Sequence, residues 1–448
     1  MEARDEGALR LQGTDVPFSF FLPKKEPDGT YSLYNGLTGK DYELNPAAAL
    51  MTLLCDGTRD VDEINQTFSE QYKVDPIEAR GTVYDFLSSL QERRQLVFRS
   101  SKIRKVKVPP PKYLVLEITN RCNLNCIHCS VRANERLGNE LTTPEWKNLI
   151  TTLAKMGVEA VGLSGGEPLL REDVFDLANH ALNQGLLVGL CTNGLLLNRE
   201  IVEKIKKMNL DVQISLDGSR PLYHDKLRNR EGSFDKLLEK VRFLREEEIK
   251  FTVAAVATAH NYKDIPDLLR LSEKIGAGSF RVQPFFPVGR GSLHREELDL
   301  DPDMTKFISS YLIEAKGASE IEVGGFYFQF TLEPDPPAIA QPCEDGACSA
   351  GYNFAGVTHD GYTYPCSHIW QLAEDNIRDK PFPWIWENSR IFNFFRSLQR
   401  ADTNQACQNC IYFSKCKGGC KAMNILDGHF RERDRHCWLT RASTEGRP

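Results

Sequence analysis

The sequence predicts an α/β protein whose core is a partial (β/α)6 barrel, and three observations lead to this fold class. Short apolar runs alternate with helix-like patterns between residues 113 and 291, which is typical of a parallel sheet. Six strand-like runs can be counted there. A cysteine-rich loop follows the first of them, and a loop with paired glycines follows the second. Functional residues collect at the carboxyl ends of barrel strands, so these loops are expected to form a site.

The barrel elements follow from their hydrophobic patterns. The predicted strands are Tyr113–Ile118, Ala160–Leu163, Leu187–Cys191, Asp211–Ser215, Phe251–Val256 and Phe280–Pro284. The predicted helices are Thr143–Met156, Arg171–Gln184, Glu200–Met208, Phe234–Glu247 and Ile265–Ile275. Cys191 lies in an apolar strand and is interpreted as a buried structural thiol.

Length and composition indicate a globular protein of several domains. The chain has 448 residues, of which 41% are hydrophobic and 26% are charged. No apolar run approaches the ~20 residues of a membrane-spanning helix. The charged amino-terminal sequence has no apolar segment of the signal-peptide type, so we expect a cytoplasmic protein. The net charge of −6 argues against bulk binding of nucleic acid.

Residues 1–100 form the first expected domain, a winged-helix-like α+β unit. Strand-like runs at Val16–Leu22 and Tyr31–Tyr34 precede three helical patterns and a closing strand. The helical patterns cover Pro46–Cys55, Asp60–Tyr72 and Pro76–Arg93, and the closing strand covers Gln95–Phe98. Several phrases, Leu44-Asn45-Pro46 among them, resemble the small precursor-peptide recognition domain of peptide-modifying enzymes. That resemblance implies a leader peptide that adds a strand to the small sheet and packs against the last helix.

Two further segments separate the expected domains. Residues 101–112 are basic and end in three prolines, which is typical of a linker. Residues 292–342 form a bridging region with a predicted helix at Met304–Ala315 and an aromatic strand-like run at Phe326–Phe330. The barrel is expected to span residues 113–291, and a cysteine-rich domain residues 343–448.

Cys122, Cys126 and Cys129 lie on the loop after the first barrel strand, with three and then two residues between them. Three close thiolates suit either zinc or an iron–sulfur cluster, and no nearby cysteine supplies a fourth ligand. An iron left open can hold a substrate or cofactor. This spacing resembles the radical S-adenosylmethionine (radical SAM) superfamily, which implies a [4Fe–4S] cluster that binds SAM at one iron.

The next loops match further motifs of that superfamily. Gly165, Gly166 and Glu167 follow the second strand, where glycines allow close approach of the backbone and a carboxylate can accept hydrogen bonds from an ammonium group. The resemblance implies that this loop holds the SAM amino group.

Four more residues are assigned to SAM through the same resemblance. Ser215 and Arg228 match positions that bind the SAM carboxylate, Arg228 through a charge-assisted fork. Asp217 matches a position near the ribose. His128 stands where an aromatic residue usually lies near the adenine, and its ring can stack or hydrogen-bond.

The carboxy-terminal quarter contains a second set of cysteines, at spacings that resemble the SPASM auxiliary-cluster domain. The alternative is two zinc sites. The resemblance implies two auxiliary [4Fe–4S] clusters and therefore three clusters in all. It assigns Cys343, Cys348, Cys366 and Cys420 to the first auxiliary cluster and Cys407, Cys410, Cys416 and Cys437 to the second.

The order of the three modules resembles maturases of ribosomally made peptides. It implies hydrogen abstraction from a precursor peptide by a 5′-deoxyadenosyl radical, with flavodoxin or ferredoxin as reductant. An intramolecular crosslink is the expected product, a thioether first, with C–C and C–O bonds also possible. Sulfatase-maturing enzymes carry a catalytic aspartate where this chain has Ser367, which argues against formylglycine formation. No general base is identified.

Three alternatives stay open at this point. Two are enzymes: a maturase of a peptide-derived redox cofactor, or a peptide epimerase. The third is a metal-binding regulator built on a winged helix.

Overall fold

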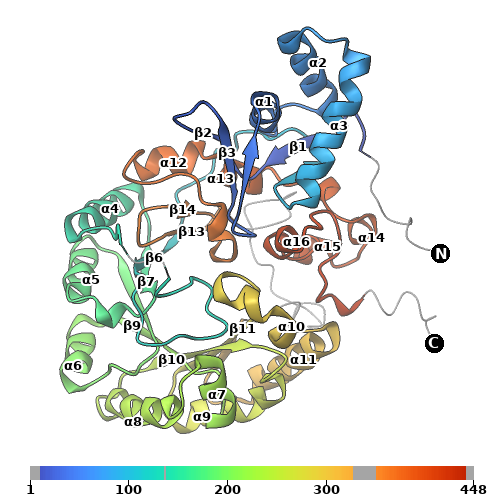
Figure 1. Ribbon diagram of the computed structural model, residues 1–448. Coiled ribbons are helices and arrows are strands. Elements are labelled where there is room, and N and C mark those ends of the chain that lie inside the picture. The colour runs from blue at the N-terminus through green and yellow to red at the C-terminus, as the bar shows by residue number, and fades with distance from the viewer. Residues whose placement is uncertain (1–10, 136–137, 326–349, 440–448) are drawn as a thin grey trace, which may run out of the picture.

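A nine-stranded sheet forms the centre of the computed structural model, which describes residues 11–135, 138–325 and 350–439 (Figure 1). The strand order is β12-β11-β10-β9-β8-β7-β6-β13-β14. Strands β6 to β13 pair in parallel, as expected for a (β/α) barrel, so the predicted fold class is confirmed. The strands are β6 (Tyr113–Thr119), β7 (Ala160–Gly165), β8 (Leu187–Thr192), β9 (Asp211–Ser215), β10 (Phe251–Ala257), β11 (Ser279–Pro284), β12 (Glu322–Gly324), β13 (Phe354–Val357) and β14 (Thr363–Tyr364).

Helices cover the outer face of this sheet (Figure 1). Alternation along the strands explains the arrangement: in β10, Phe251, Val253 and Ala255 are buried toward the helices, while the residues between them face the barrel interior. The helices are α4 (Thr143–Met156), α5 (Val174–Asn183), α6 (Arg199–Met208), α7 (Pro221–Arg228), α8 (Ser233–Glu246), α9 (Ile265–Lys274), α10 (Arg295–Leu298) and α11 (Pro302–Ala318). Residues Pro221–Arg228 had not been predicted as a helix.

The amino-terminal region contains two small sheets and three helices. One sheet pairs β1 (Val16–Ser19) with β5 (Leu96–Arg99), and the other has the order β2-β3-β4. Asn45, Asp60 and Asp75 cap the three helices, which explains where each begins. The remaining elements are β2 (Lys24–Lys25), β3 (Tyr31–Asn35), β4 (Lys40–Leu44), α1 (Pro46–Leu54), α2 (Val61–Tyr72) and α3 (Pro76–Glu92). Strands β2 and β4 were missed because they are short and polar.

The carboxy-terminal region extends the barrel sheet and then forms short helices. β13 pairs with β6 in parallel, with Phe354 opposite Tyr113. Its helices are α12 (Phe382–Asn388), α13 (Arg390–Arg396), α14 (Gln405–Gln408), α15 (Phe413–Cys416) and α16 (Lys421–Asp427). The predicted strand at Phe326–Phe330 lies outside the described residues, and so do Cys343 and Cys348. Among the helices that the structure describes, none is long and apolar enough to cross a membrane.

One hydrophobic core joins the two ends of the chain. Phe18 of β1 stacks on Phe394 of α13 with ring centroids 4.7 Å apart. Both belong to a cluster that also contains buried residues of α3 and α16. Figure 1 shows the blue amino-terminal region beside the orange α13 and the red α16. The amino-terminal region is therefore fixed to the carboxy-terminal region by core packing.

The segment between that region and the barrel runs without helix or strand along α12 and α13. The indole of Trp386 donates to the carbonyl of Pro109 at 3.1 Å, and Lys105 donates to the side chain of Asn388 at 2.7 Å. The domain boundaries expected from the sequence stay predictions.

Candidate functional site

The loop between β6 and α4 carries Cys122, Cys126 and Cys129. Cys126 is buried and the other two are half-buried. The Leu124 N–H donates to Cys122 Sγ at 3.4 Å. Burial raises the pKa of Cys122 to about 11, and the neighbouring Cys126 and Cys129 contribute to the rise, so the three thiols lie within electrostatic reach of one another. The structure thus gathers the three cysteines that the sequence selected.

The glycine loop after β7 packs directly on the cysteine loop. The Gly166 N–H donates to the carbonyl of Thr119 at 2.7 Å, and the Glu167 N–H donates to that of Arg121 at 2.8 Å. Gly165 has φ +119°, a conformation that side-chain-bearing residues rarely adopt. A Cβ at Gly166 would overlap the carbonyl oxygen of Arg121. The paired glycines are therefore required for this contact.

We predict that Gly166→Ala displaces the cysteine loop. An added methyl at a closed backbone contact destabilises by about 1–3 kcal/mol, and here the strain falls on the loop that carries the three cysteines. Iron content after anaerobic reconstitution should fall by one cluster, about four irons per chain. Gly317→Ala is the matched control because a Cβ there meets nothing within 4 Å. Full iron content in Gly166→Ala would contradict the prediction.

Arg290 holds the cysteine loop from the other side, and no sequence motif marks this residue. The residue lies in the 3-10 helix Gly289–His294. Its N–H donates to the carbonyl of Cys129 at 2.8 Å, and its guanidinium donates to the carbonyls of Cys126 at 3.1 Å and Ala133 at 2.6 Å. The indole of Trp370, in the carboxy-terminal region, donates to the carbonyl of Ser130 at 2.7 Å. The loop is thus fixed by three parts of the chain.

Glu167 lies at the start of the short turn after β7 and is fully buried. Its carboxylate accepts from the Thr192 hydroxyl at 2.7 Å and from the Asn193 and Leu169 N–H groups at 2.8 and 3.1 Å. Burial raises the pKa of Glu167, and these hydrogen bonds oppose the rise. Oε1 accepts two of these hydrogen bonds and Oε2 accepts one, so Oε2 can still accept from an additional donor.

Asp217, Arg228 and His128 form one buried group beside the cysteines. Asp217 Oδ2 lies 2.7 Å from Arg228 Nη2 and 3.3 Å from His128 Nε2. Arg228 Nη1 also lies 3.8 Å from Cys126 Sγ. Burial raises the pKa of Asp217, but the Arg228 guanidinium outweighs that effect and the pKa stays below its usual range. Burial lowers the pKa of His128 to about 4.

This arrangement adds partners that the sequence did not suggest. Arg228 is engaged by Asp217 and faces Cys126, and His128 Nδ1 lies 3.1 Å from the carbonyl of Leu227. Ser215 ends β9 and is half-buried. The roles assigned to these side chains toward SAM stay predictions.

The described carboxy-terminal cysteines divide into two places. Cys437 interacts electrostatically with Cys407 and Cys410, and Cys416 interacts with Cys437, so these four thiols lie together. Burial raises the pKa of Cys437 to about 11 and that of Cys416 to about 12. Cys366 and Cys420 pack instead against the core shared with the amino-terminal region. The assignment of the two sets to two auxiliary clusters stays a prediction.

Within the residues that the structure describes, no three Cys, His, Asp or Glu side chains form a site for a single metal ion. A four-iron cluster does not need such a set, because each cysteine binds a different iron. The three close thiols of the cysteine loop and the four of the carboxy-terminal group supply the ligand type and number that such clusters take.

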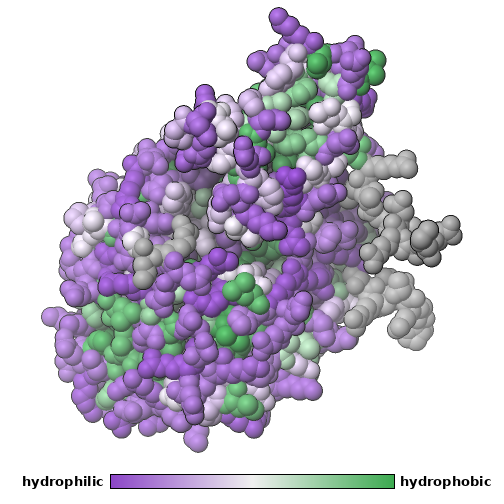
Figure 2. Space-filling model, in the orientation of Figure 1, coloured by the Kyte–Doolittle hydropathy of each residue, from purple (hydrophilic) through white to green (hydrophobic). Residues whose placement is uncertain are grey.

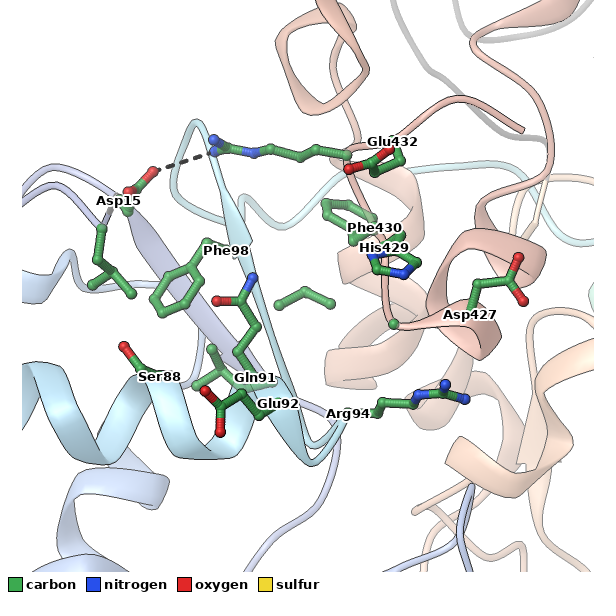
Figure 3. A pocket seen from close by; sticks show the side chains of 15 residues that line it. Asp15, Ser88, Gln91, Glu92, Arg94, Phe98, Asp427, His429, Phe430 and Glu432 are labelled. Atoms are coloured by element: carbon green, nitrogen blue, oxygen red, sulfur yellow. Dashed lines mark hydrogen bonds and ion pairs between the residues drawn. The ribbon is translucent and has the colours of Figure 1, made fainter. Parts of the chain in front are cut away.

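A separate cavity of about 500 Å³ lies between α3, β5 and residues 427–432 (Figure 3). Figure 3 shows Gln91 and Glu92 on one side and Asp427, His429 and Glu432 on the other. An ion pair between Asp15 and Arg431, 3.5 Å long, lies at its edge. No cysteine lines this cavity, so it is a feature of the interface between the two regions and not of the cysteine site.

Three family models match the chain in sequence order. The model of the coenzyme PQQ synthesis protein D matches residues 31–96, that of the radical SAM superfamily residues 116–272, and that of the SPASM iron–sulfur cluster-binding domain residues 348–411. The three matches correspond to the amino-terminal region, the barrel and the carboxy-terminal region.

Relatives match over most of the chain. An AdoMet-dependent heme synthase of Methanosarcina barkeri is 31% identical over 342 residues, which cover 73% of this chain and 96% of that protein. A PqqA peptide cyclase of Bradyrhizobium diazoefficiens is 31% identical over 74% of this chain and 87% of that protein. A mycofactocin maturase of Mycobacterium ulcerans is 31% identical over 71% of this chain and 85% of that protein.

A solved structure supports the fold across almost the whole chain. Streptococcus suis SuiB bound to S-adenosylmethionine has a TM-score of 0.62 and 19% identity, and the match covers 94% of this chain and 99% of SuiB.

Proposed function

Because the chain belongs to the radical SAM superfamily and carries a PqqD-type domain and a SPASM domain, we propose that it crosslinks a ribosomally made precursor peptide. The observation that carries this proposal is that the three modules occur in one chain and contact one another. A domain with a free strand edge shares one core with the carboxy-terminal region, and that region contacts the cysteine loop of the barrel through Trp370. Direct contacts thus link the region proposed to recognise the peptide with the loop proposed to bind the cluster.

Cys122, Cys126 and Cys129 are the proposed ligands of the SAM-binding cluster. Glu167 is positioned by its hydrogen bonds to accept from the SAM amino group, and Gly165 and Gly166 bring this loop onto the cysteine loop. When bound, the cluster and SAM supply a carbon-centred radical that takes hydrogen from an unactivated carbon. The chain contributes by holding the cofactor and by aiming the peptide carbon at it.

Arg228 and Asp217 have linked roles in this proposal. The pairing with Asp217 fixes the guanidinium beside Cys126, where its positive charge favours a thiolate. Arg228 keeps further N–H donors for the SAM carboxylate. His128 lies between Asp217 Oδ2 at 3.3 Å and the Leu227 carbonyl at 3.1 Å, and its neutral imidazole donates to one of the two, which orients the ring toward the adenine.

Cys407, Cys410, Cys416 and Cys437 are the proposed ligands of one auxiliary cluster, and Cys366 and Cys420 contribute to the other with Cys343 and Cys348. A thioether forms when a cysteine S–H and a C–H are replaced by an S–C bond. The 5′-deoxyadenosyl carbon would take up one hydrogen atom, the remaining hydrogen would leave as a proton, and an auxiliary cluster held by these cysteines would supply the acceptor for the remaining electron. A low-potential donor such as flavodoxin or ferredoxin supplies the electron that starts each cycle. Cysteines that bind clusters must stay reduced, so we place the chain in the cytoplasm, where thiols are kept reduced.

Strand β4 is the proposed docking edge for the leader peptide. It is an edge strand of five residues, most of them exposed, and it lies beside the end of α3, where Arg93 stands 5.0 Å over the ring of Tyr42. An extended peptide can pair with such an edge through backbone hydrogen bonds. Figure 2 shows hydrophobic residues gathered over the α1 to α3 part of this region, and Leu53 and Ile77 are exposed there.

We predict that Tyr42→Ala weakens binding of the leader about tenfold, because aromatic side chains dominate the binding energy of peptide interfaces. Fluorescence anisotropy with a labelled candidate precursor peptide, chosen from any short reading frames near the gene, measures the effect. Tyr72→Ala, at the far end of α2, is the control for loss of a tyrosine elsewhere in this region; Tyr72 is exposed, whereas Tyr42 is half-buried. Equal weakening by both variants would argue against recognition at β4. Point variants are required because deleting residues 1–100 would also expose the core of α13 and α16.

Mass spectrometry of that peptide tests the proposed reaction. Incubation with the reconstituted chain, SAM and reductant should remove two hydrogens from the peptide, and a thioether also removes one cysteine from the pool that iodoacetamide alkylates. No mass change with 5′-deoxyadenosine formed would contradict crosslinking. Retention of mass with uptake of solvent deuterium would indicate epimerisation instead.

A maturase of a peptide-derived redox cofactor is the second candidate. The PqqA peptide cyclase and the mycofactocin maturase favour it, since each is 31% identical to this chain. In that case the peptide loses mass without losing an alkylatable thiol. Two relatives are named AdoMet-dependent heme synthase and Fe-coproporphyrin III synthase, so an incubation with Fe-coproporphyrin in place of the peptide is a necessary negative control.

A further inference from the structure

A cavity of about 680 Å³ opens at the amino ends of the barrel strands and reaches into the barrel interior. Residues that begin or lie midway along β6, β8, β9, β10 and β11 line it. The outward residues of these strands, such as Val253 and Val282, pack under the helices, so the alternate positions face the interior. We call this space the lumen. It lies beneath the loops that form the proposed SAM site.

Tyr113, Cys191, Gln213 and Arg281 are among the polar side chains that line the lumen, and Thr252 and Ser279, whose hydroxyls lie 2.6 Å apart, line it too. Gly162 leaves room for one of them, because a Cβ there would overlap the Tyr113 hydroxyl. Cys191 is half-buried and belongs to the lumen wall, which corrects its interpretation as a fully buried core thiol. An apolar strand pattern could not reveal this, because every second residue of a barrel strand faces the interior.

Arg281 is the unusual member of this set. Its side chain is exposed in the lumen and makes no ion pair or hydrogen bond within the described part of the chain. Its neighbours on the adjacent strands are Ala254 and Gly324, which leave space around the guanidinium. By contrast, the buried Arg99 and Arg228 are each paired with a carboxylate. A cation held in a cavity without a partner is suited to an anionic ligand.

The position of Arg281 relative to the proposed SAM site follows from the strand register. Ser215 lies opposite Ala254, and Ala254 lies opposite Arg281, so the three residues form one row across the barrel. Cys191 lies opposite Gln213, in the row that continues through Thr252 to Ser279, two residues nearer the amino ends than Arg281. A ligand on Arg281 would therefore lie in the row of Ser215, at the edge of the proposed SAM site and inside the same lumen.

The charged residues at the mouth of the lumen do not pair with Arg281. Asp211, Lys250, Glu320 and Glu322 line the rim. Glu322 lies opposite Ser279, two residues nearer the amino ends than Arg281, which is about 7 Å along the strand. Within the described chain none of these carboxylates forms an ion pair with Arg281.

We propose that Arg281, with Gln213 and Tyr113 on the same lumen wall, forms a carboxylate-binding subsite that orients the peptide segment to be modified. The carboxylate belongs either to an Asp or Glu side chain or to the carboxyl terminus of the peptide. This subsite rests on the proposed function for its biological ligand, but its chemistry can be tested without turnover. The guanidinium supplies a bidentate fork, and Gln213 and Tyr113 supply neutral donors.

Protection from phenylglyoxal tests the subsite in the reconstituted full chain. The probes are N-acetylglutamic acid amide, its glutamine analogue and N-acetylglycine, and Arg242 on α8 is the matched control because it is also exposed and makes no ion pair in the described chain. A carboxylate probe should slow the labelling of Arg281 several-fold and leave Arg242 unchanged. Protection by the glutamic acid probe indicates a side-chain carboxylate, and protection by N-acetylglycine indicates a terminal one. Equal protection by the glutamine analogue, or an Arg281 that does not react without probe, would overturn the proposal.

A variant series gives an independent test with the peptide that the wild-type chain modifies. Arg281→Gln should lower kcat/KM for peptide modification about 10- to 100-fold, and Arg281→Lys should recover part of it. Removing the carboxylate from the peptide should lower kcat/KM by a similar factor with wild-type protein and should leave it almost unchanged with Arg281→Gln. If the two changes together lower kcat/KM by the product of their separate factors, the subsite proposal is overturned. If the wild-type chain modifies no peptide, the proposed function fails while the labelling result still decides the subsite.

Discussion

Replacing Cys122, Cys126 and Cys129 together with alanine should abolish formation of 5′-deoxyadenosine while the auxiliary iron remains. Reconstituted wild-type chain should hold about twelve irons and the triple variant about eight, since each cluster contains four. The physical reason is separation in space. The three thiols lie on the loop after β6, whereas Cys407, Cys410, Cys416 and Cys437 gather in the carboxy-terminal region.

Cys55→Ala is the control for loss of a cysteine outside these sets. Cys55 is fully buried in the amino-terminal core, and its thiol donates to the carbonyl of Met51 at 3.1 Å. This variant should keep both its iron and its activity. Retained 5′-deoxyadenosine production in the triple variant would remove the assignment of the SAM-binding cluster.

Asp402→Ala should destabilise the chain by about 3–5 kcal/mol, the usual cost of leaving one partner of a buried ion pair alone. Asp402 Oδ2 lies 3.0 Å from Arg99 Nη2, and both side chains are fully buried. The same carboxylate accepts from the N–H groups of Ser100 and Gln399 at 2.9 and 3.0 Å. Removing it strands a guanidinium and two N–H groups between the amino-terminal and carboxy-terminal regions. Urea unfolding followed by circular dichroism measures the loss.

The pH dependence of this loss has a definite sign. Burial raises the pKa of Asp402, but Arg99 and the backbone donors outweigh that effect, so the folded pKa lies below the unfolded value of about 3.9. The carboxylate therefore stabilises the fold above pH 4, and this contribution is lost as the pH falls through the folded pKa. The difference between wild type and Asp402→Ala should be full at pH 7 and shrink in acid.

Two controls isolate the buried pair. Glu200→Ala removes an exposed pair with Lys204 and should cost less than about 0.5 kcal/mol. Replacing both Arg99 and Asp402 with apolar residues of similar size should recover part of the loss, because no charge is then left unpaired. A change below about 1 kcal/mol in Asp402→Ala would show that the pair does not hold the two regions together.

The barrel could be predicted because its strands are strongly apolar and regularly spaced. Leu187–Cys191 and Phe251–Val256 show this pattern, and they appear as β8 and β10 within one residue at each end. Strands β2, β4 and β14 have two to five residues, which is too short for a periodic pattern to be recognised. Pairing of β13 with β6 joins residues more than 200 positions apart, and local patterns carry no information on such contacts.

The same limit applies to the candidate site. Motifs such as Cys122 to Cys129 and Gly165 to Glu167 span only a few residues, so the sequence alone is enough to recognise them. Arg290 supports the cysteine loop from a segment about 160 residues away, and a single arginine between glycines gives no periodic or motif signal. The pairing of Asp217 with both Arg228 and His128 likewise depends on the fold. Sequence reasoning found the residues and missed their mutual contacts.

Transfer of deuterium from the peptide to 5′-deoxyadenosine is the most direct test of the central claim. The candidate precursor peptide is prepared with deuterium at its carbon-bound positions and incubated with the reconstituted chain, SAM and reductant. The account predicts 5′-deoxyadenosine that carries one deuterium, in amounts equal to the modified peptide. Unlabelled 5′-deoxyadenosine together with an unaltered peptide would contradict it.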